Sequence, residues 1–405
     1  MWKNDASRLG IMKPHDFAPD RQRFLLRVGS GDIAYWAFVP PPLPPQLTFD
    51  RTGLHHLSEA DRAIGELAGL ARALPNPHLL IKPFMRREAV LSSRIEGTQA
   101  DLADLYAYEA GQLVLPSLRD ADIPSDVREV HNYVLALEYG LERVNTLPVS
   151  LRLIRELHEK LMHGVRGEHA TPGEFRRSQN WIGPPGCTLN EAVFVPPPVD
   201  QMHQALDALE KYIHEPDEYP PLVRLALIHY QFEAIHPFLD GNGRVGRLLI
   251  TLLMVHWNLL PTPLLYLSAF FEKHRQEYYE RLLRVSTHGE WYAWVYFFLR
   301  GVTEQARDAV SRARKLQDLR EEWRNALQQA RASALQIRLI DLLFESPILT
   351  IPQAQQYLGV TYRSAQSAIG RMMAIGALEP LDSRRYGKRF IARRILDVLT
   401  QDAPE

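Results

Sequence analysis

The 405-residue sequence predicts a mainly α-helical protein that carries one small β-hairpin and ends in a separate small domain. First, apolar residues recur at helical spacing through most of the chain between residues 57 and 330. Second, two short β-prone runs, around 180–182 and 193–195, are separated by a loop with glycine and proline, and no other strand pair is expected before residue 330. Third, three short helical runs after residue 330 are followed by two strand-like runs around a basic turn.

The chain is expected to divide into an N-terminal arm (residues 1–54), a helical domain (55–330) and a C-terminal domain (331–405). Within the arm, residues 35–45 combine aromatic side chains with prolines. Because proline disrupts helices and central strands, this strip should lie extended on a surface. A proline-recognising partner could bind it, but packing across the chain's own helical domain is the simpler expectation.

The overall charge excludes a global attraction to nucleic acid or to membranes. Lysine and arginine total 47 and aspartate and glutamate 48, which gives a formal net charge of −1. The single cysteine, Cys187, excludes an intrachain disulfide and fits a reducing cytosol. The N-terminus lacks an apolar signal core, and no apolar run is long enough to span a membrane. We therefore expect a cytoplasmic protein with no membrane partner.

Residues 236–247 read HPFLDGNGRVGR and place a base, a carboxylate, a glycine-flanked turn and two arginines within twelve positions. Pro237 disfavours helical geometry at His236, so the preceding helical pattern should end there. A new helical pattern begins near Asn242. The segment is therefore predicted to form a helix, a loop and a second helix.

A glycine-rich loop that leads into a helix offers free backbone N–H groups and the positive end of the helix dipole to an anion. Arg244 and Arg247 lie three apart on one face of the second helix and can bind phosphate oxygens. Asp240 has the wrong sign for phosphate and suits Mg²⁺ instead. His236, with an ordinary pKa of about 6.5, could take a proton from an attacking hydroxyl. The pattern predicts a polyphosphate site with a general base; the simpler alternative is a turn with surface charges.

These twelve residues resemble the Fic family motif, His-Pro-Phe-x-Asp/Glu-Gly-Asn-Gly-Arg-x-x-Arg, at every specified position. The resemblance implies a Fic-type helical bundle and an adenylyltransferase that moves AMP from ATP, with Mg²⁺ or Mn²⁺ on Asp240, to a Ser, Thr or Tyr hydroxyl of a target protein or of the chain itself. Gly243 favours AMP transfer, because the related Doc-like kinases carry lysine at that position. The implied catalytic residue is His236, and the implied ATP-binding residues are His236, Gly241, Asn242, Gly243, Arg244, Val245, Gly246, Arg247, Tyr278 and Glu96.

A helix predicted near residues 79–97 should end at Gly97, which leaves Glu96 in the last turn, where the helix dipole disfavours a carboxylate. Glu96 therefore needs a cationic partner from elsewhere. Ser92, Glu96 and Gly97 resemble the inhibitory motif of Fic proteins, whose glutamate pairs with the second motif arginine, here Arg247, and competes with the γ-phosphate. The alternative is a solvated glutamate at a helix end.

The hairpin predicted near residues 180–195 has an exposed edge, which proteins normally conceal. It resembles the Fic flap, which adds a target segment as an extra strand, and this implies that Ile182, Val193 and Phe194 dock the target. A purely structural hairpin is the alternative. Tyr278 resembles the tyrosine that packs near adenine in the family, although helical tyrosines are as often core residues.

Residues 331–405 resemble a winged helix-turn-helix domain. Between Arg363 and Arg394 the sequence holds eight basic and two acidic residues, a local net charge of +6, so this face could bind DNA. Winged helices also bind proteins or form homodimers.

Other functions stay open beside the transferase. The same site could remove AMP, with Glu96 orienting a water molecule. The chain could instead be a DNA-binding regulator that uses its Fic domain to sense nucleotide, although the intact motif argues against this as the sole function. A metal hydrolase is less consistent with the sequence, because His229 and His236 have no third ligand nearby.

Overall fold

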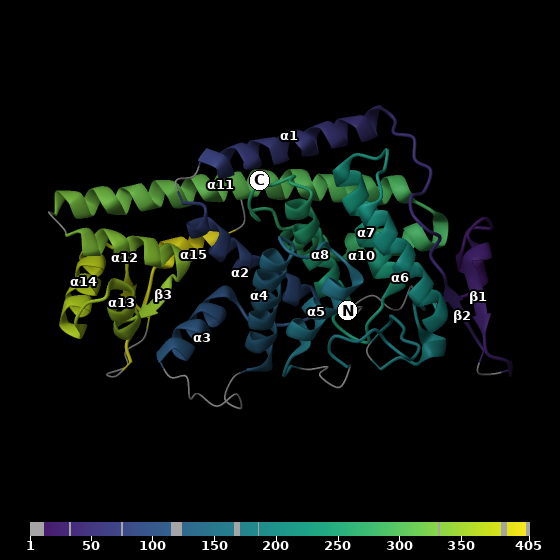
Figure 1. Cartoon of the computed structure of the whole chain (residues 1–405), viewed down its shortest axis with the longest axis horizontal. Coiled ribbons are helices and arrows are strands. Elements are labelled where there is room, and N and C mark those ends of the chain that lie inside the picture. The colour runs from purple at the N-terminus through teal and green to yellow at the C-terminus, as the bar shows by residue number, and fades with distance from the viewer. Residues whose placement is uncertain are drawn as a thin grey trace.

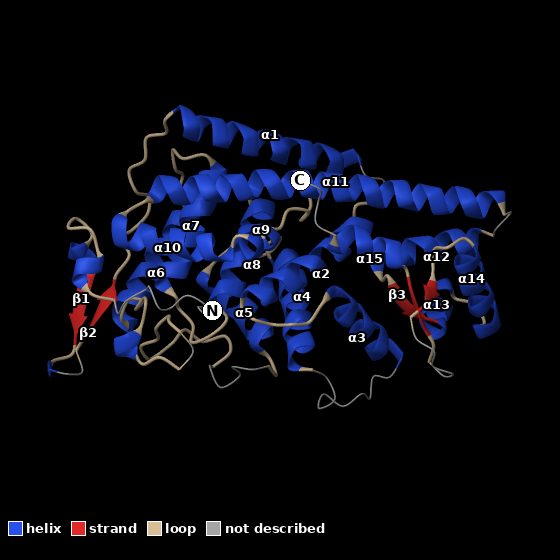
Figure 2. Ribbon diagram, turned by 180° about the vertical axis from the view of Figure 1, so that it is seen from behind, coloured by secondary structure: helices blue, strands red, loops and turns tan. Residues whose placement is uncertain are grey.

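The computed structural model describes residues 12–31, 34–73, 76–114, 124–165, 171–184, 186–330, 333–381 and 387–401. The molecule is elongated, and two long helices, α1 (Arg51–Ala73) and α11 (Trp291–Gln329), lie side by side along its length (Figure 1). The view from behind shows that helices form almost all of the body (Figure 2). The predicted mainly α fold class is confirmed.

The helical body surrounds α8 (Asn242–His256), which contacts α2 (His78–Ile95), α4 (Ser125–Arg143), α5 (Leu151–Met162) and α7 (Pro221–Ile235). Every residue of α8 from Asn242 to Met254 is buried, which marks it as a core helix. The motif therefore leads into the most enclosed helix of the body. The remaining helices of the body are α3 (Leu102–Val114), α6 (Val199–His214), α9 (Ser268–Lys273) and α10 (Arg275–His288).

The N-terminal arm contains an antiparallel pair, β1 (Leu25–Val28) and β2 (Tyr35–Phe38), that the sequence analysis did not expect. The expectation of a single strand pair before residue 330 was therefore wrong. Phe38 is fully buried, and its N–H donates to the Val195 carbonyl at 2.9 Å, so β2 is stabilised by contact with the body. Helix α1 begins at Arg51, within the last residues of the expected arm.

The predicted flap hairpin is reduced to one bridge between Ile182 and Phe194. The Ile182 N–H donates to the Phe194 carbonyl at 2.8 Å, and a short 3₁₀ helix, Leu189–Glu191, lies between the two sides. The next hydrogen-bonded pair along an antiparallel ladder would be Asn180 with Pro196, and Pro196 has no N–H to donate. On the other edge, the Val195 carbonyl accepts the Phe38 N–H of β2. Two more 3₁₀ turns occur in the arm, at Pro14–Asp16 and Gln22–Phe24.

The C-terminal domain forms one end of the molecule and contains a three-stranded antiparallel sheet in the order β3-β5-β4 (Figure 1). The predicted basic turn, residues 384–388, lies partly outside the described residues, because residues 382–386 are not described. Arg393 and Arg394 pair with Glu379 and Glu322, so part of the basic charge of this segment is neutralised. Its elements are α12 (Ala334–Glu345), β3 (Ile348–Thr350), α13 (Ile351–Leu358), α14 (Tyr362–Ala374), β4 (Glu379–Pro380), β5 (Arg389–Ile391) and α15 (Arg393–Thr400).

Within the described ranges, every helix is too short or too polar to cross a lipid bilayer.

Candidate functional site

The loop between α7 and α8 has the geometry that the motif predicted. Helix α7 ends at Ile235, and α8 begins at Asn242. His236 adopts a left-handed conformation, with φ 51° and ψ 61°, which is uncommon for a residue other than glycine and must be held by its surroundings. Gly241, with φ 80°, closes the turn without that cost. The first N–H groups of α8, at Asn242, Gly243 and Arg244, have no intrahelical acceptor.

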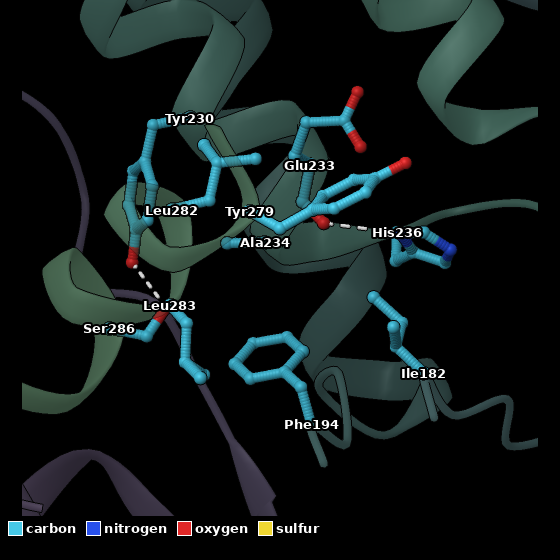
Figure 3. Close-up of a pocket in the computed structure, with 10 residues that line it drawn as sticks. All are labelled: Ile182, Phe194, Tyr230, Glu233, Ala234, His236, Tyr279, Leu282, Leu283 and Ser286. Carbon is cyan, nitrogen blue, oxygen red and sulfur yellow. Dashed lines mark hydrogen bonds between the residues drawn. The ribbon is translucent and has the colours of Figure 1, made fainter. Parts of the chain in front are cut away.

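His236 is set up as a proton acceptor. Its Nδ1 lies 3.2 Å from the Glu233 carbonyl oxygen (Figure 3). Because a carbonyl can only accept, Nδ1 carries the proton and Nε2 is left with a free lone pair. Burial, together with the positive charge of Arg176, lowers the pKa of His236 to about 4. The imidazole is therefore neutral at the pH of a cell.

A cavity opens beside His236. Tyr279 and Ile182 lie near the imidazole, and Phe194 lies across the cavity near Leu283 (Figure 3). Glu233 also lines the cavity, and burial and the nearby Glu96 raise its pKa to about 8. The mostly apolar walls of this cavity match the chemistry of an aromatic base. The other lining residues are Tyr230, Ala234, Leu282, Leu283 and Ser286.

Tyr278, the predicted contact for the base, does not line this cavity. It is 1% exposed, and its hydroxyl lies 2.8 Å from His229 Nε2 in the core. The next residue along α10 points in another direction, so Tyr279 lines the cavity instead. The candidate contact for the nucleobase is therefore Tyr279 and not Tyr278.

Buried Arg247 and partly buried Glu96 form an ion pair, with Glu96 Oε1 and Arg247 Nη2 2.8 Å apart. Arg247 also donates from Nε to the Ser92 hydroxyl and from Nη2 to the Ser92 carbonyl. Burial opposes ionisation of Glu96, but the charge and hydrogen bond of Arg247 outweigh it, so the pKa of Glu96 lies below its ordinary value. The dipole conflict at the end of α2 is resolved by this arginine.

The Glu96 carboxylate also lies against the first turn of α8. A Cβ on Gly243 would come within 2.4 Å of Glu96 Oε1 and within 3.0 Å of Arg247 Nη1. Gly243 therefore gives the carboxylate room at the positive end of α8, where anions are favoured. Gly97, with φ 101°, lets the chain turn away directly after Glu96.

Arg244 is also buried, at 3% exposure, and Glu129 on α4 holds it. Its Nη2 lies 3.6 Å from Asp240 Oδ1, which accepts the Gly241 N–H at 2.6 Å. The Asp240 side chain is about half exposed, at 47%. Arg244 and Asp240 therefore lie close together where the loop meets the start of α8.

The structure brings most of the predicted residues together. His236, Asp240 and the arginines share one loop and helix start, and Ser92, Glu96 and Gly97 meet them from α2. Ile182 and Phe194 reach the cavity, whereas Val193 is buried and bonds through its N–H to the Ile182 carbonyl. Val245 and Gly246 lie inside α8, and Gly246 packs against Glu233.

Several polar residues at the site were not predicted, among them Glu129, Glu233, His158, Arg176 and Asn180. His158 lies on the apolar face of α5, between Ile154 and Met162, and a histidine there is a signal that could have been followed. Arg176 and Asn180 lie in the loop before Ile182, and nothing in their spacing distinguishes them from ordinary loop residues.

Residues 54–142 match the family model described as "Fic/DOC family N-terminal", and residues 148–254 match the model described as "Fic/DOC family". The chain carries these two Fic/DOC family domains. The motif of residues 236–247 lies inside the second domain, and the helix that bears Glu96 lies inside the first.

Curated relatives match the Fic part of the chain. The chain is 27% identical over 167 residues to "Protein adenylyltransferase Fic" of Drosophila grimshawi, and 29% identical over 168 residues to the protein of that name in Aedes aegypti. Each match covers 40% of this chain but 31% and 30% of the two relatives, which is less than a third of their length.

A solved structure shares the fold. A Fic family protein from Desulfovibrio desulfuricans G20 superimposes with a TM-score of 0.54 at 22% identity, covering 86% of this chain and 98% of that chain. At this identity the likeness concerns the Fic fold.

Proposed function

We propose that this protein is an adenylyltransferase that moves AMP from Mg·ATP to a Ser, Thr or Tyr hydroxyl of a protein. One observation carries the proposal: a neutral His236, with Nε2 free, stands beside a cavity and ahead of a helix N-terminus that has two buried arginines. A general base next to an anion site is what attack on a phosphoanhydride requires. The Fic/DOC family domains and the adenylyltransferase relatives support the same reaction.

In the proposed reaction the target hydroxyl oxygen attacks the α-phosphorus of ATP. A new P–O bond forms, and the bond to the β-phosphate oxygen breaks, so pyrophosphate leaves with the electron pair. His236 Nε2 accepts the hydroxyl proton as the new bond forms, while its Nδ1–H stays on the Glu233 carbonyl. A positioned base of this kind typically contributes about 10²–10⁴-fold to the rate.

The phosphates would bind at the start of α8, on the N–H groups of Asn242, Gly243 and Arg244 and on the guanidinium groups of Arg244 and Arg247. Glu96 holds Arg247 and lies against Gly243 at the same helix start. A triphosphate and the Glu96 carboxylate therefore compete for one place, and the proposed enzyme is autoinhibited.

Asp240 suits a divalent cation. Its carboxylate is half exposed, and it is a hard oxygen donor next to the proposed phosphate site, as Mg²⁺ or Mn²⁺ prefers. A bound cation would neutralise charge on the phosphate oxygens. The protein's part is to hold Asp240 in place, through the Gly241 N–H on Oδ1 and through Arg244 nearby.

Changing Asp240 to asparagine should lower AMP transfer about 10²-fold in a Glu96→Gly background, because several kcal/mol of charge stabilisation would be lost. Titration of Mg²⁺ should show a higher metal requirement for the variant. Asp200→Asn, at an exposed carboxylate at the start of α6, is the control and should match its parent. An unchanged magnesium requirement in Asp240→Asn would place the cation elsewhere.

The decisive test is ATP labelled at the α- or the γ-phosphate, incubated with wild type, Glu96→Gly and His236→Ala. Protein labelled from the α-phosphate alone, most strongly in Glu96→Gly and absent in His236→Ala, is the expected result. Label from the γ-phosphate alone would identify a kinase. No label in any variant, given ATP binding, would leave a nucleotide-sensing protein.

A further inference from the structure

Several backbone carbonyl oxygens in residues 236–241, the loop that carries His236, accept hydrogen bonds from residues that have no role in the proposed reaction. The His236 carbonyl accepts from Arg176 Nε at 3.0 Å and from Asn180 Nδ2 at 3.1 Å. The Phe238 carbonyl accepts from the same Asn180 Nδ2 at 2.8 Å, and the Pro237 carbonyl accepts the backbone N–H of Arg176 at 2.9 Å. Three consecutive carbonyls therefore accept hydrogen bonds from Arg176 and Asn180, and the Phe238 carbonyl also accepts one from Asn242 Nδ2 at 2.8 Å.

Arg176 is a buried cation that bonds to carbonyl oxygens. It is 1% exposed, and among the described residues it forms no ion pair with a carboxylate. Its remaining donors go to the carbonyls of Ser178 and Pro197, and burial lowers its pKa to about 10. A buried charge without an acidic partner is costly to maintain. Its hydrogen bonds offset that cost by tying the catalytic loop to the two sides of the flap.

His158 holds the far end of the loop, and its tautomer follows from its two neighbours. The Gly173 N–H donates to Nδ1 at 2.9 Å, so Nδ1 carries no proton. Nε2 then carries the proton and donates to the Asp240 carbonyl at 3.0 Å. The ring also stacks on Phe238, with centroids 3.7 Å apart and planes 7° apart.

We propose that His158, Arg176 and Asn180 are positioning residues that form a carbonyl clamp on residues 236–240. A peptide group is planar, so a bound carbonyl fixes the direction of its whole peptide unit. The clamp holds His236 in its left-handed conformation and sets where its ring and the Asp240 carboxylate lie relative to the N–H groups of α8. The clamp rests on the proposed function, since it explains how that reaction's loop keeps its shape.

A matched pair of variants at His158 tests the clamp. In a Glu96→Gly background, His158→Gln keeps a donor near the Nε2 position, whereas His158→Asn keeps a polar group near Nδ1 but cannot reach the Asp240 carbonyl. ATP affinity is measured by calorimetry, transfer by α-label, and Tm by thermal unfolding. We expect His158→Gln to stay within about threefold of its parent. His158→Asn should lose about tenfold in both ATP affinity and kcat at a similar Tm, as loss of one hydrogen bond on a buried carbonyl suggests.

Two outcomes overturn the clamp: equal losses in both variants that follow Tm, which would mean a structural role only, or no loss in either. ATP affinity does not depend on the reaction. If it separates the pair while no AMP is transferred, the clamp stands and the proposed function fails. If AMP is transferred and the two His158 variants have equal ATP affinity and equal kcat, the proposed function stands and the clamp fails.

Two further measurements cover the case in which a His158 variant does not fold. Nitrogen-15 NMR of histidine-labelled wild type should show His158 with its proton on Nε2, because the Gly173 N–H donates to Nδ1. A proton on Nδ1 would contradict the geometry. Arg176→Lys keeps the charge but not the fork of donors, and should lower kcat about tenfold with a smaller change in KM for ATP. An unchanged kcat would remove Arg176 from the clamp.

Discussion

Replacing Glu96 by glycine should raise AMP transfer about a hundredfold. The Glu96–Arg247 pair is largely enclosed, and Arg247 also donates to Ser92 of α2, the helix that ends at Glu96. A preference of about 3 kcal/mol for this closed arrangement leaves under about 1% of molecules competent to bind ATP productively. Removing the carboxylate abolishes that preference. The measurement is the initial rate of α-label incorporation at saturating ATP.

Glu96→Gln separates charge from shape. It retains a hydrogen-bond acceptor for Arg247 but no negative charge, so its rate should fall between wild type and Glu96→Gly. Glu142→Gly, at an exposed position in the last turn of α4, controls for glycine at a helix end and should behave as wild type. If Glu96→Gly is no faster than wild type, Glu96 does not restrain the site.

The inhibitory ion pair between Glu96 and Arg247 should also persist at acidic pH. The pKa of Glu96 lies below its ordinary value of about 4.5, so its stabilising charge is present above that value and is lost only as the pH falls through the lower folded value. Acidification from pH 8 to 5 should therefore leave wild type restrained. If the AMP-transfer rate of wild type rises over this range and that of Glu96→Gly does not, inhibition does not depend on an ionised Glu96.

The sequence predicted the parts of this site that depend on local rules. Pro237 placed the end of α7 at the correct residue, and the glycine-rich turn placed the start of α8 at Asn242. The pairing of Glu96 with Arg247 spans 151 residues. The unfavourable position of Glu96 at a helix C-terminus predicted only that it needs a cationic partner, and the resemblance to the Fic inhibitory motif implied that this partner is Arg247.

What the sequence missed depends on tertiary packing. Strand β2 pairs with β1 because Phe38 is buried against the body, and the strands are too short for a clear alternation of apolar and polar residues. Tyr278 and Tyr279 are adjacent tyrosines on one helix, and only the packing of α10 decides which of them faces the cavity. The pKa of His236 differed from its expected value because burial depends on neighbours far away in the sequence.

Replacing His236 by alanine should lower AMP transfer about 10²–10⁴-fold in the Glu96→Gly background, while ATP affinity stays within about threefold. The base is lost, but the phosphate site on α8 remains. His163→Ala removes an exposed histidine just after α5 and should have no effect. Calorimetry with ATP and the α-label rate measure the two properties separately.

The pH dependence of the reaction follows from the lowered pKa of His236. Only the neutral imidazole accepts a proton, and its pKa in the free protein is lowered to about 4, so kcat/KM should stay flat as the pH falls from 7 to 5. Bound ATP adds negative charge near the ring and favours its protonated form, so the acid limb of kcat should lie at a higher pH than that of kcat/KM. His236→Asn keeps a donor near Nδ1 for the Glu233 carbonyl but has no base at Nε2, and it should be as inactive as His236→Ala. Transfer retained by His236→Asn would show that another group takes the proton, and the acid limb would then belong to that group.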